Sequence, residues 1–173
     1  MELVAAVMLA TAVALALLGW RLPTRAQLVV SATLVLLLAG AAALALAAIH
    51  ADDSDNVGLV LAGVLAVLGG GVVTSSVFGL VDGMSDDDDN AVRRAGDVLR
   101  GGAWIGALER CAVFVTLLAG WPEGLAVTLA LKGLGRYPEL RTETPGAAER
   151  FIIGTFTSVL WAVACAGAAT TMA

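Results

Sequence analysis

The sequence predicts an all-α fold, a polytopic integral membrane bundle of about six transmembrane helices with both termini outside. The chain of 173 residues is 59% apolar and only 14% charged, whereas average soluble domains carry roughly 25% charged residues. Its apolar residues form six stretches, and a hydrocarbon core of roughly 30 Å needs about 20 apolar residues per helix. The polar gaps between the stretches alternate in charge, and this alternation predicts the orientation of the bundle.

Basic residues occur only in or near alternate gaps. Arg21 and Arg25 lie in the first gap. The third and fifth gaps and their borders hold the others: Arg93, Arg94, Arg100, Arg110, Lys132, Arg136, Arg141 and Arg150. The second gap, 50–56, and the fourth, around Glu123, contain no Lys or Arg. Because basic residues are retained on the cytoplasmic side during insertion, the odd-numbered gaps are expected inside.

The first three helices are expected over 3–20, 26–49 and 57–81, and they form an apolar half, 1–81. Pro23 separates the first two, because proline does not continue a helix comfortably. Trp20 suits the headgroup level. The acidic gap that follows His50 is interpreted as a solvated outer loop, since so short a gap holds nothing to orient metal ligands. The sequence predicts no metal site and no cofactor.

Small residues follow one face of the third predicted helix. Gly71, Ser75 and Gly79 recur every four residues and therefore lie in one row. Small side chains at this spacing allow close packing of membrane helices. The alternative is an unwound segment that lines an ion path. Packing is the favoured interpretation, because broken helices are the rarer arrangement.

Residues 82–101 are expected to form a charged cytoplasmic loop. Four consecutive aspartates at 86–89 repel one another and extend the chain. After them, Val92, Ala95 and Leu99 fall on one face of a short helix, opposite several arginines. Such a helix could lie on the inner leaflet, and a plain soluble loop is the alternative.

The charge-bearing half, 102–173, completes a single membrane domain with helices over 103–120, 121–137 and 148–169. The apolar stretch 124–134 is short, which often indicates a re-entrant segment. A crossing is favoured, because a re-entrant segment would leave the basic residues of the fifth gap outside. Helix over 121–137 would span about 25 Å at 1.5 Å per residue.

The candidate site is a cluster of ionisable residues at the inner ends of the last three helices. Its members are Glu109, Arg110, Lys132, Arg136, Glu139 and Glu149. Small residues beside them invite close helix packing or line a pore: Gly102, Gly106, Gly154 and Ser158. Ionisable groups within a membrane are costly, so they mark either a buried pair or a function. A structural ion-pair network is favoured; the alternative is a phosphate or carboxylate pocket formed by Arg110, Lys132 and Arg136, with Glu109 as a proton carrier.

The sequence favours a non-enzymatic binding or scaffold protein, which would hold anionic lipid headgroups of the inner leaflet or a protein partner. Its acids and bases nearly balance, and no nucleophile elbow, Walker loop, HExxH or paired CxxC is present. No catalytic residue is therefore assigned. A small oligomeric transporter or channel is the alternative, and a lipid-modifying enzyme using Glu109 is the least favoured. Homo-oligomerisation is left open, and a net charge of −5 argues against nucleic acid as a partner.

Three blocks of the second half carry a resemblance: IGALER at 105–110, KGLGRYPEL at 132–140 and AERFIIGT at 148–155. Together they resemble a family of small bacterial membrane proteins of unknown function. The resemblance covers about 101–160, and the Ala-, Gly- and Asp-rich composition is similar to actinobacterial members of that family. It implies an integral protein of the bacterial cytoplasmic (inner) membrane, and it implies no activity or cofactor.

Overall fold

The computed structural model describes residues 2–47, 56–84, 102–140 and 146–171. These residues form helices and no strand, so the all-α prediction is confirmed. The helices are α1 (Glu2–Gly19), α2 (Thr24–Ala47), α3 (Asn56–Met84), α5 (Gly102–Leu118), α6 (Glu123–Gly135), the single turn α7 (Tyr137–Leu140) and α8 (Ala147–Thr170). The acidic gap before α3 and the loop predicted over 85–101, including its short amphipathic helix, lie outside the described residues.

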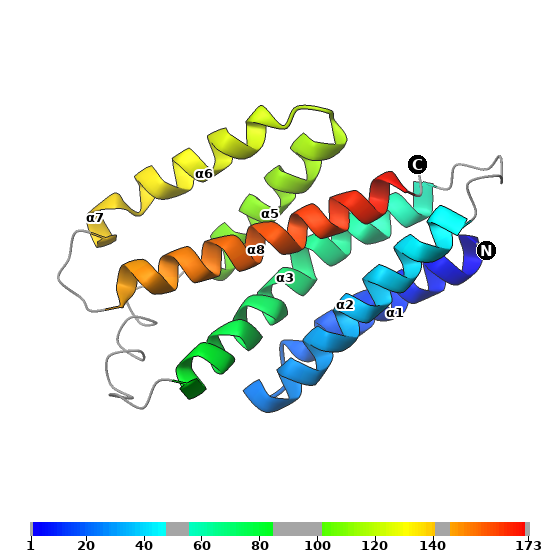
Figure 1. Ribbon diagram of the computed structural model, residues 1–173, viewed down its shortest axis with the longest axis horizontal. Coiled ribbons are helices and arrows are strands. Elements are labelled where there is room, and N and C mark those ends of the chain that lie inside the picture. Colours follow the sequence, from blue (N-terminus) through cyan, green and yellow to red (C-terminus); the bar gives the residue numbers. More distant parts are fainter. Residues whose placement is uncertain (1, 48–55, 85–101, 141–145, 172–173) are drawn as a thin grey trace.

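The long helices run in alternating directions, so consecutive helices are antiparallel (Figure 1). The N-terminus and the C-terminus lie at one end of the bundle. The opposite end, called the basic end below, carries Arg21, Arg25, Arg136 and Arg150. The arrangement therefore gathers at one end these four basic residues of the first and fifth gaps.

Helix α3 lies at the centre of the bundle, where it packs against α1, α2, α5 and α8. Helix α6 lies at the edge and packs mainly on α5. Much of the core is alanine, which lets the helices approach closely. Between α2 and α3, the buried hydroxyls of Ser31 and Ser76 are 2.7 Å apart, and Ser76 also donates to Val72 O at 2.9 Å. Ser31 is therefore the donor of the pair, since a hydroxyl has a single hydrogen.

Among the described residues, three helices are long and apolar enough to cross a membrane: α2, α3 and α8. The apolar part of α1, Leu3–Gly19, is shorter, and α5 and α6 contain 17 and 13 residues. Three of the six predicted spans thus have the length and composition that a crossing needs.

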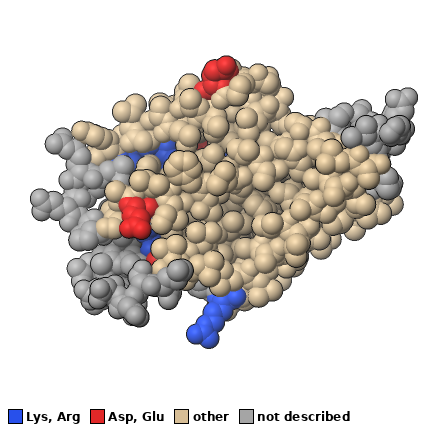
Figure 2. Space-filling model, in the orientation of Figure 1, with Lys and Arg blue, Asp and Glu red and all other residues tan. Residues whose placement is uncertain are grey.

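Large apolar side chains cover the outside of the bundle, including Trp104 at 81% exposure. In Figure 2 the right-hand part of the surface displays no charged atoms among its coloured residues. In water such a surface would be a strong aggregation liability.

Two helices, α3 and α6, have ends that differ from the sequence predictions. Helix α3 continues past Val81 to Met84, because the carboxylate of Asp82 is neutralised by Arg150 of α8 and does not have to leave the helix.

Helix α6 is shorter than 121–137. The chain reverses before it at Gly120, whose φ of 67° favours glycine, and the Trp121 N–H donates to Thr116 O at 2.9 Å as in a Schellman motif. After Gly135, Arg136 leaves the helical conformation, so Tyr137 belongs to α7.

Candidate functional site

The glycine run at 69–71 in α3 makes room for three large side chains. A Cβ at the three positions would lie, in chain order, 2.8 Å from the Trp161 ring, 2.3 Å from Arg110 Cδ and 2.6 Å from the Trp20 ring. None of these positions therefore accepts a side chain without displacing its neighbour. The close packing predicted for Gly71 is made by the indole of Trp20, which lies over the glycine backbone.

The same three side chains donate hydrogen bonds to backbone carbonyls of α3. The bonds are Trp161 Nε1 to Leu65 O (3.1 Å), Trp20 Nε1 to Leu68 O (3.2 Å), and Arg110 Nε and Nη2 to Val67 O (3.0 and 2.7 Å). A helix carbonyl is ordinarily screened by side chains one turn further on. The glycines remove that screen and allow a side chain to reach the backbone.

Arg110 is the one buried cation among the described residues. Its side chain belongs to α5, is 4% exposed, and donates from Nη1 to Ser158 Oγ of α8 at 3.2 Å. In the described part of the chain it forms no ion pair with a carboxylate. Of its five N–H groups, three are used by Val67 and Ser158, so two remain. The charge of Glu109 attracts the guanidinium from a distance, but Glu109 is paired with Lys132. A buried charge without a paired counter-ion is unfavourable unless something else compensates it.

Arg110 lines a cavity of about 290 Å³ between α3, α5 and α8, called the Arg110 cavity below. Arg110 and Ser158 lie deepest, near the middle of their helices, and the cavity extends from them toward the basic end. Among its lining residues are the aromatic rings of Trp20, Phe78 and Phe151 and the cations Lys132, Arg136 and Arg150. Glu109 is the one carboxylate among the described lining residues. The charged residues of the lining are therefore mainly cationic, whereas the sequence suggested a near balance of charge, and the rest of the lining is mostly apolar or glycine.

Thr155 contributes a buried hydroxyl without a hydrogen-bond partner in the described structure, and this residue also lines the Arg110 cavity. A helical threonine commonly bonds to the carbonyl one turn earlier, and buried polar atoms are rarely left unpaired. The Thr155 hydroxyl is thus available to a molecule in the cavity.

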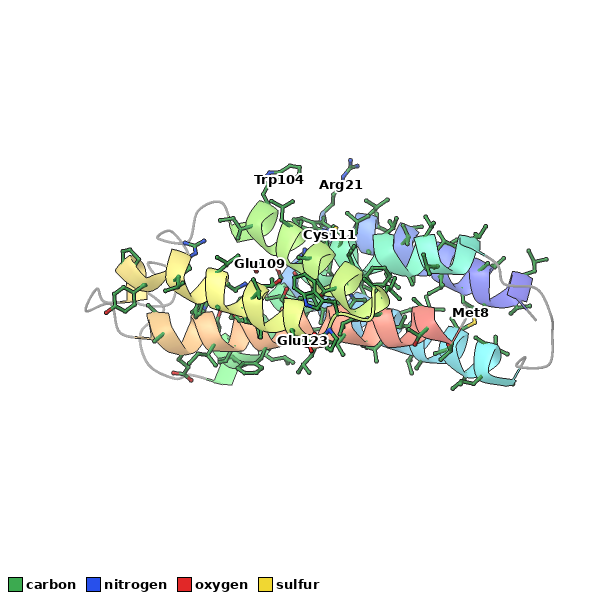
Figure 3. All side chains as sticks on the ribbon, turned by 90° about the horizontal axis from the view of Figure 1, so that it is seen from above. Met8, Arg21, Trp104, Glu109, Cys111 and Glu123 are labelled. Carbon is green, nitrogen blue, oxygen red and sulfur yellow. The ribbon has the colours of Figure 1, made fainter. Side chains whose placement is uncertain are left out.

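Glu109 and Lys132 form an ion pair that joins α5 to α6. Their side chains are 13% and 16% exposed, and the Lys132 ammonium lies 5.9 Å from the centroid of the Phe151 ring. In Figure 3 Glu109 lies between these two helices, whereas Trp104 projects away from the bundle. The neighbours Glu109 and Arg110 therefore have different partners and do not pair with each other.

A second ion pair, between Arg150 and Asp82, lies at the basic end of the bundle, where Arg150 also lines the cavity. Arg150 donates to both carboxylate oxygens of Asp82, at 2.8 and 3.2 Å, and its guanidinium carbon lies 4.4 Å from the centroid of the Phe78 ring. Phe78 in turn fills the space above Gly154, where a Cβ would lie 2.8 Å from the ring. Sequence reasoning missed this pair because Asp82 was assigned to a loop. Asp82 and Arg150 have opposite charges and lie at two helix ends that meet at the basic end. This complementarity could have predicted the pair.

The structure brings together four members of the predicted cluster, Glu109, Arg110, Lys132 and Arg136, around the Arg110 cavity. Glu149 is exposed and is not among the lining residues, and the side chain of Glu139 is outside the described part. Most of the predicted small residues also line the cavity: Gly71, Ser75, Gly102, Gly106, Gly154 and Ser158. Gly79 is not among the lining residues.

The pore interpretation of the α3 glycine face meets an obstacle beyond Arg110. There the buried side chains of Trp161 and Phe114 pack at Gly69 and Gly63. The α3 face that continues the cavity is thus occupied by aromatic rings. Within the described residues, no group of three or more His, Cys, Asp or Glu side chains is arranged to hold a metal ion.

Comparisons with protein-family models, curated proteins and solved structures find no match to this chain. The resemblance of 101–160 to a small bacterial membrane family therefore stays a prediction.

Proposed function

We propose that this chain is a non-enzymatic membrane protein that binds a phosphate-bearing anion in the Arg110 cavity. One observation carries the proposal: a buried guanidinium lines a cavity and has no carboxylate partner among the described residues. An anion in the cavity would supply the missing counter-charge.

The groups around the cavity suit phosphate. Arg110 is already held in place by Val67 and Ser158, so little side-chain entropy is lost when its two remaining N–H groups bind. Charge-assisted hydrogen bonds from arginine to phosphate are stronger than neutral ones. The Thr155 hydroxyl offers a further donor. Because Glu109 is engaged by Lys132, we assign it a positioning role and not an acid–base role.

We further propose that the chain crosses the bacterial cytoplasmic membrane six times, with the basic end in the cytoplasm and both termini outside. The alternating helix directions and the charge distribution support this orientation. The shorter helices α5 and α6 can be accommodated, since the bilayer can thin locally around a short hydrophobic span. The Arg110 cavity would then open toward the inner leaflet.

Single cysteines test this orientation. In a chain carrying C111S and C165A, Glu123→Cys at the exposed start of α6 should react with a membrane-impermeant maleimide in intact cells. Arg21→Cys, in the exposed α1–α2 turn, should react only after the membrane is permeabilised. The reverse pattern, or equal labelling of both positions in intact cells, would contradict the proposed orientation.

Lipid binding tests the proposed function directly. Purified protein in nanodiscs of phosphatidylcholine should retain added phosphatidate with about tenfold preference over added phosphatidylcholine, equivalent to about 1.4 kcal/mol. Native mass spectrometry after release from the nanodisc measures the retained lipid. Calorimetry with glycerol 3-phosphate provides the soluble arm and separates a lipid headgroup from a free phosphate ester. If neither phosphate compound binds in preference to phosphatidylcholine, the proposed function is wrong.

A further inference from the structure

A second cavity, of about 370 Å³, lies between α5 and α6 and is called the α5–α6 cavity below. It is open to the surface: its apolar lining comes from both helices and includes Leu108, Ala112 and Leu131, of which Leu108 and Leu131 are 71% and 65% exposed. This volume falls at the lower end of the roughly 300–1,000 Å³ that is typical of small-molecule sites. The cavity lies at the edge of the bundle, because α6 packs mainly on α5.

The two cavities share part of their walls. Ile105, Glu109, Lys132 and Arg136 line both of them. The Glu109–Lys132 ion pair therefore lies where the cavities adjoin, with the buried Arg110 on one side and the apolar lining of α5 and α6 on the other. A site that is cationic at one side and apolar at the other fits an anionic amphiphile.

We infer that the ligand is an anionic phospholipid, whose phosphate occupies the Arg110 cavity while one acyl chain occupies the α5–α6 cavity. This inference rests on the proposed function and names its ligand class. A soluble phosphate ester would leave the α5–α6 cavity unused, whereas a lipid has an apolar chain attached to the same phosphate. Because that cavity lies between two helices at the bundle edge, a chain can enter it sideways from the bilayer.

A photoreactive lipid tests the inference on the complete chain. Phosphatidate with a diazirine in one acyl chain is added to the protein in phosphatidylcholine nanodiscs, illuminated, and its adducts are mapped by peptide mass spectrometry. Adducts should concentrate on Leu108, Ala112 and Leu131, about tenfold over Leu36 of α2 and Val60 of α3, which are apolar and similarly exposed but do not line the cavity. An even distribution over all lipid-facing residues would overturn the inference, and this comparison needs no variant.

A pair of matched substitutions adds a second readout. Ala112→Phe fills the α5–α6 cavity and should lower the adduct yield there about tenfold. Ala130→Phe, an exposed position that is not among the lining residues, should leave the yield unchanged. Leu131→Trp fills the same cavity from α6 and replaces Ala112→Phe if that variant does not fold. Unchanged adducts in a folded cavity-filling variant would contradict the inference.

The two proposals fail in different ways. If glycerol 3-phosphate binds as tightly as phosphatidate and no adducts concentrate on α5 and α6, the acyl-chain inference is wrong and the phosphate site stands. If neither compound binds in preference to phosphatidylcholine, the proposed function fails, and the acyl-chain inference fails with it.

Discussion

Arg110→Met is expected to lower the affinity for phosphatidate about 100-fold, equivalent to about 2.7 kcal/mol, without lowering the melting temperature. The loss of affinity follows from two missing hydrogen bonds to the anion, since each charge-assisted bond contributes about 1.5–3 kcal/mol. Methionine retains most of the apolar stem and removes the buried charge. Native mass spectrometry measures the affinity, and thermal unfolding in detergent micelles measures the stability.

The stability expectation follows from the groups that Arg110 would leave behind. Val67 O keeps its place in the α3 hydrogen-bond ladder, and the Ser158 hydroxyl can bond to a carbonyl of its own helix. No buried polar atom loses its last partner. Replacing buried ionic groups by apolar residues of similar volume is often neutral or stabilising by about 1–4 kcal/mol.

Arg25→Met is the matched control, because Arg25 is exposed at the same end of the bundle and does not line the cavity. Its affinity should equal that of the unsubstituted chain. If the role of Arg110 is structural, its replacement should lower the melting temperature and leave phosphatidate binding unchanged. A lower melting temperature with retained phosphatidate binding in Arg110→Met would therefore favour the scaffold interpretation over ligand binding.

Gly70→Ala is expected to destabilise the bundle by about 1–3 kcal/mol, the range for an overfilled core. The new Cβ would lie 2.3 Å from Cδ and 2.7 Å from Nε of Arg110, so the overlap involves the middle of the side chain and not a flexible tip. Arg110 must then move away from Val67 and lose its bonds to that carbonyl. We also expect weaker phosphatidate binding, because the guanidinium is displaced from its cavity. Unfolding titrations and native mass spectrometry measure the two effects.

Gly133→Ala is a control that should raise the stability of the bundle, whereas Gly70→Ala should lower it. Nothing lies within 4 Å of a Cβ at that position in α6, so alanine should stabilise the helix by about 0.5–1 kcal/mol through its propensity alone. A double-mutant cycle locates the cause of the Gly70→Ala effect. If the overlap with Arg110 is responsible, Gly70→Ala should destabilise an Arg110→Ala background much less. Equal destabilisation in both backgrounds would exclude this explanation.

The predicted cluster illustrates how far sequence reasoning reaches at the site. Glu109, Lys132 and Arg136 could be assigned to one end of the bundle from helix positions and the basic gaps. The pairing of Glu109 with Lys132 depends on the rotation of α5 against α6, which hydropathy does not encode. The acceptor of Arg110 is the Val67 carbonyl, and a backbone acceptor has no side-chain signature in any sequence.

For the glycines of α3, too, the sequence predicted one property and the tertiary structure decided another. Their spacing indicated close packing along one face, and the large side chains at 69–71 do approach the backbone closely. Which side chains occupy those positions could not be predicted, because Trp20, Arg110 and Trp161 come from three different helices. The α5–α6 cavity likewise had no counterpart in the sequence analysis, since a cavity arises from the fit of two helices and not from the composition of either.

The sequence by itself determined the helical class, the approximate positions of the helices and the separation of basic from acidic gaps. These properties depend on local composition and on the need of a bilayer for apolar, internally hydrogen-bonded segments. Only the tertiary structure decided that Arg110 reaches α3 and α8 instead of a carboxylate, and that Asp82 meets Arg150. The physical reason is that helix rotation and register are set by side-chain packing between elements distant in the chain, which local patterns do not specify.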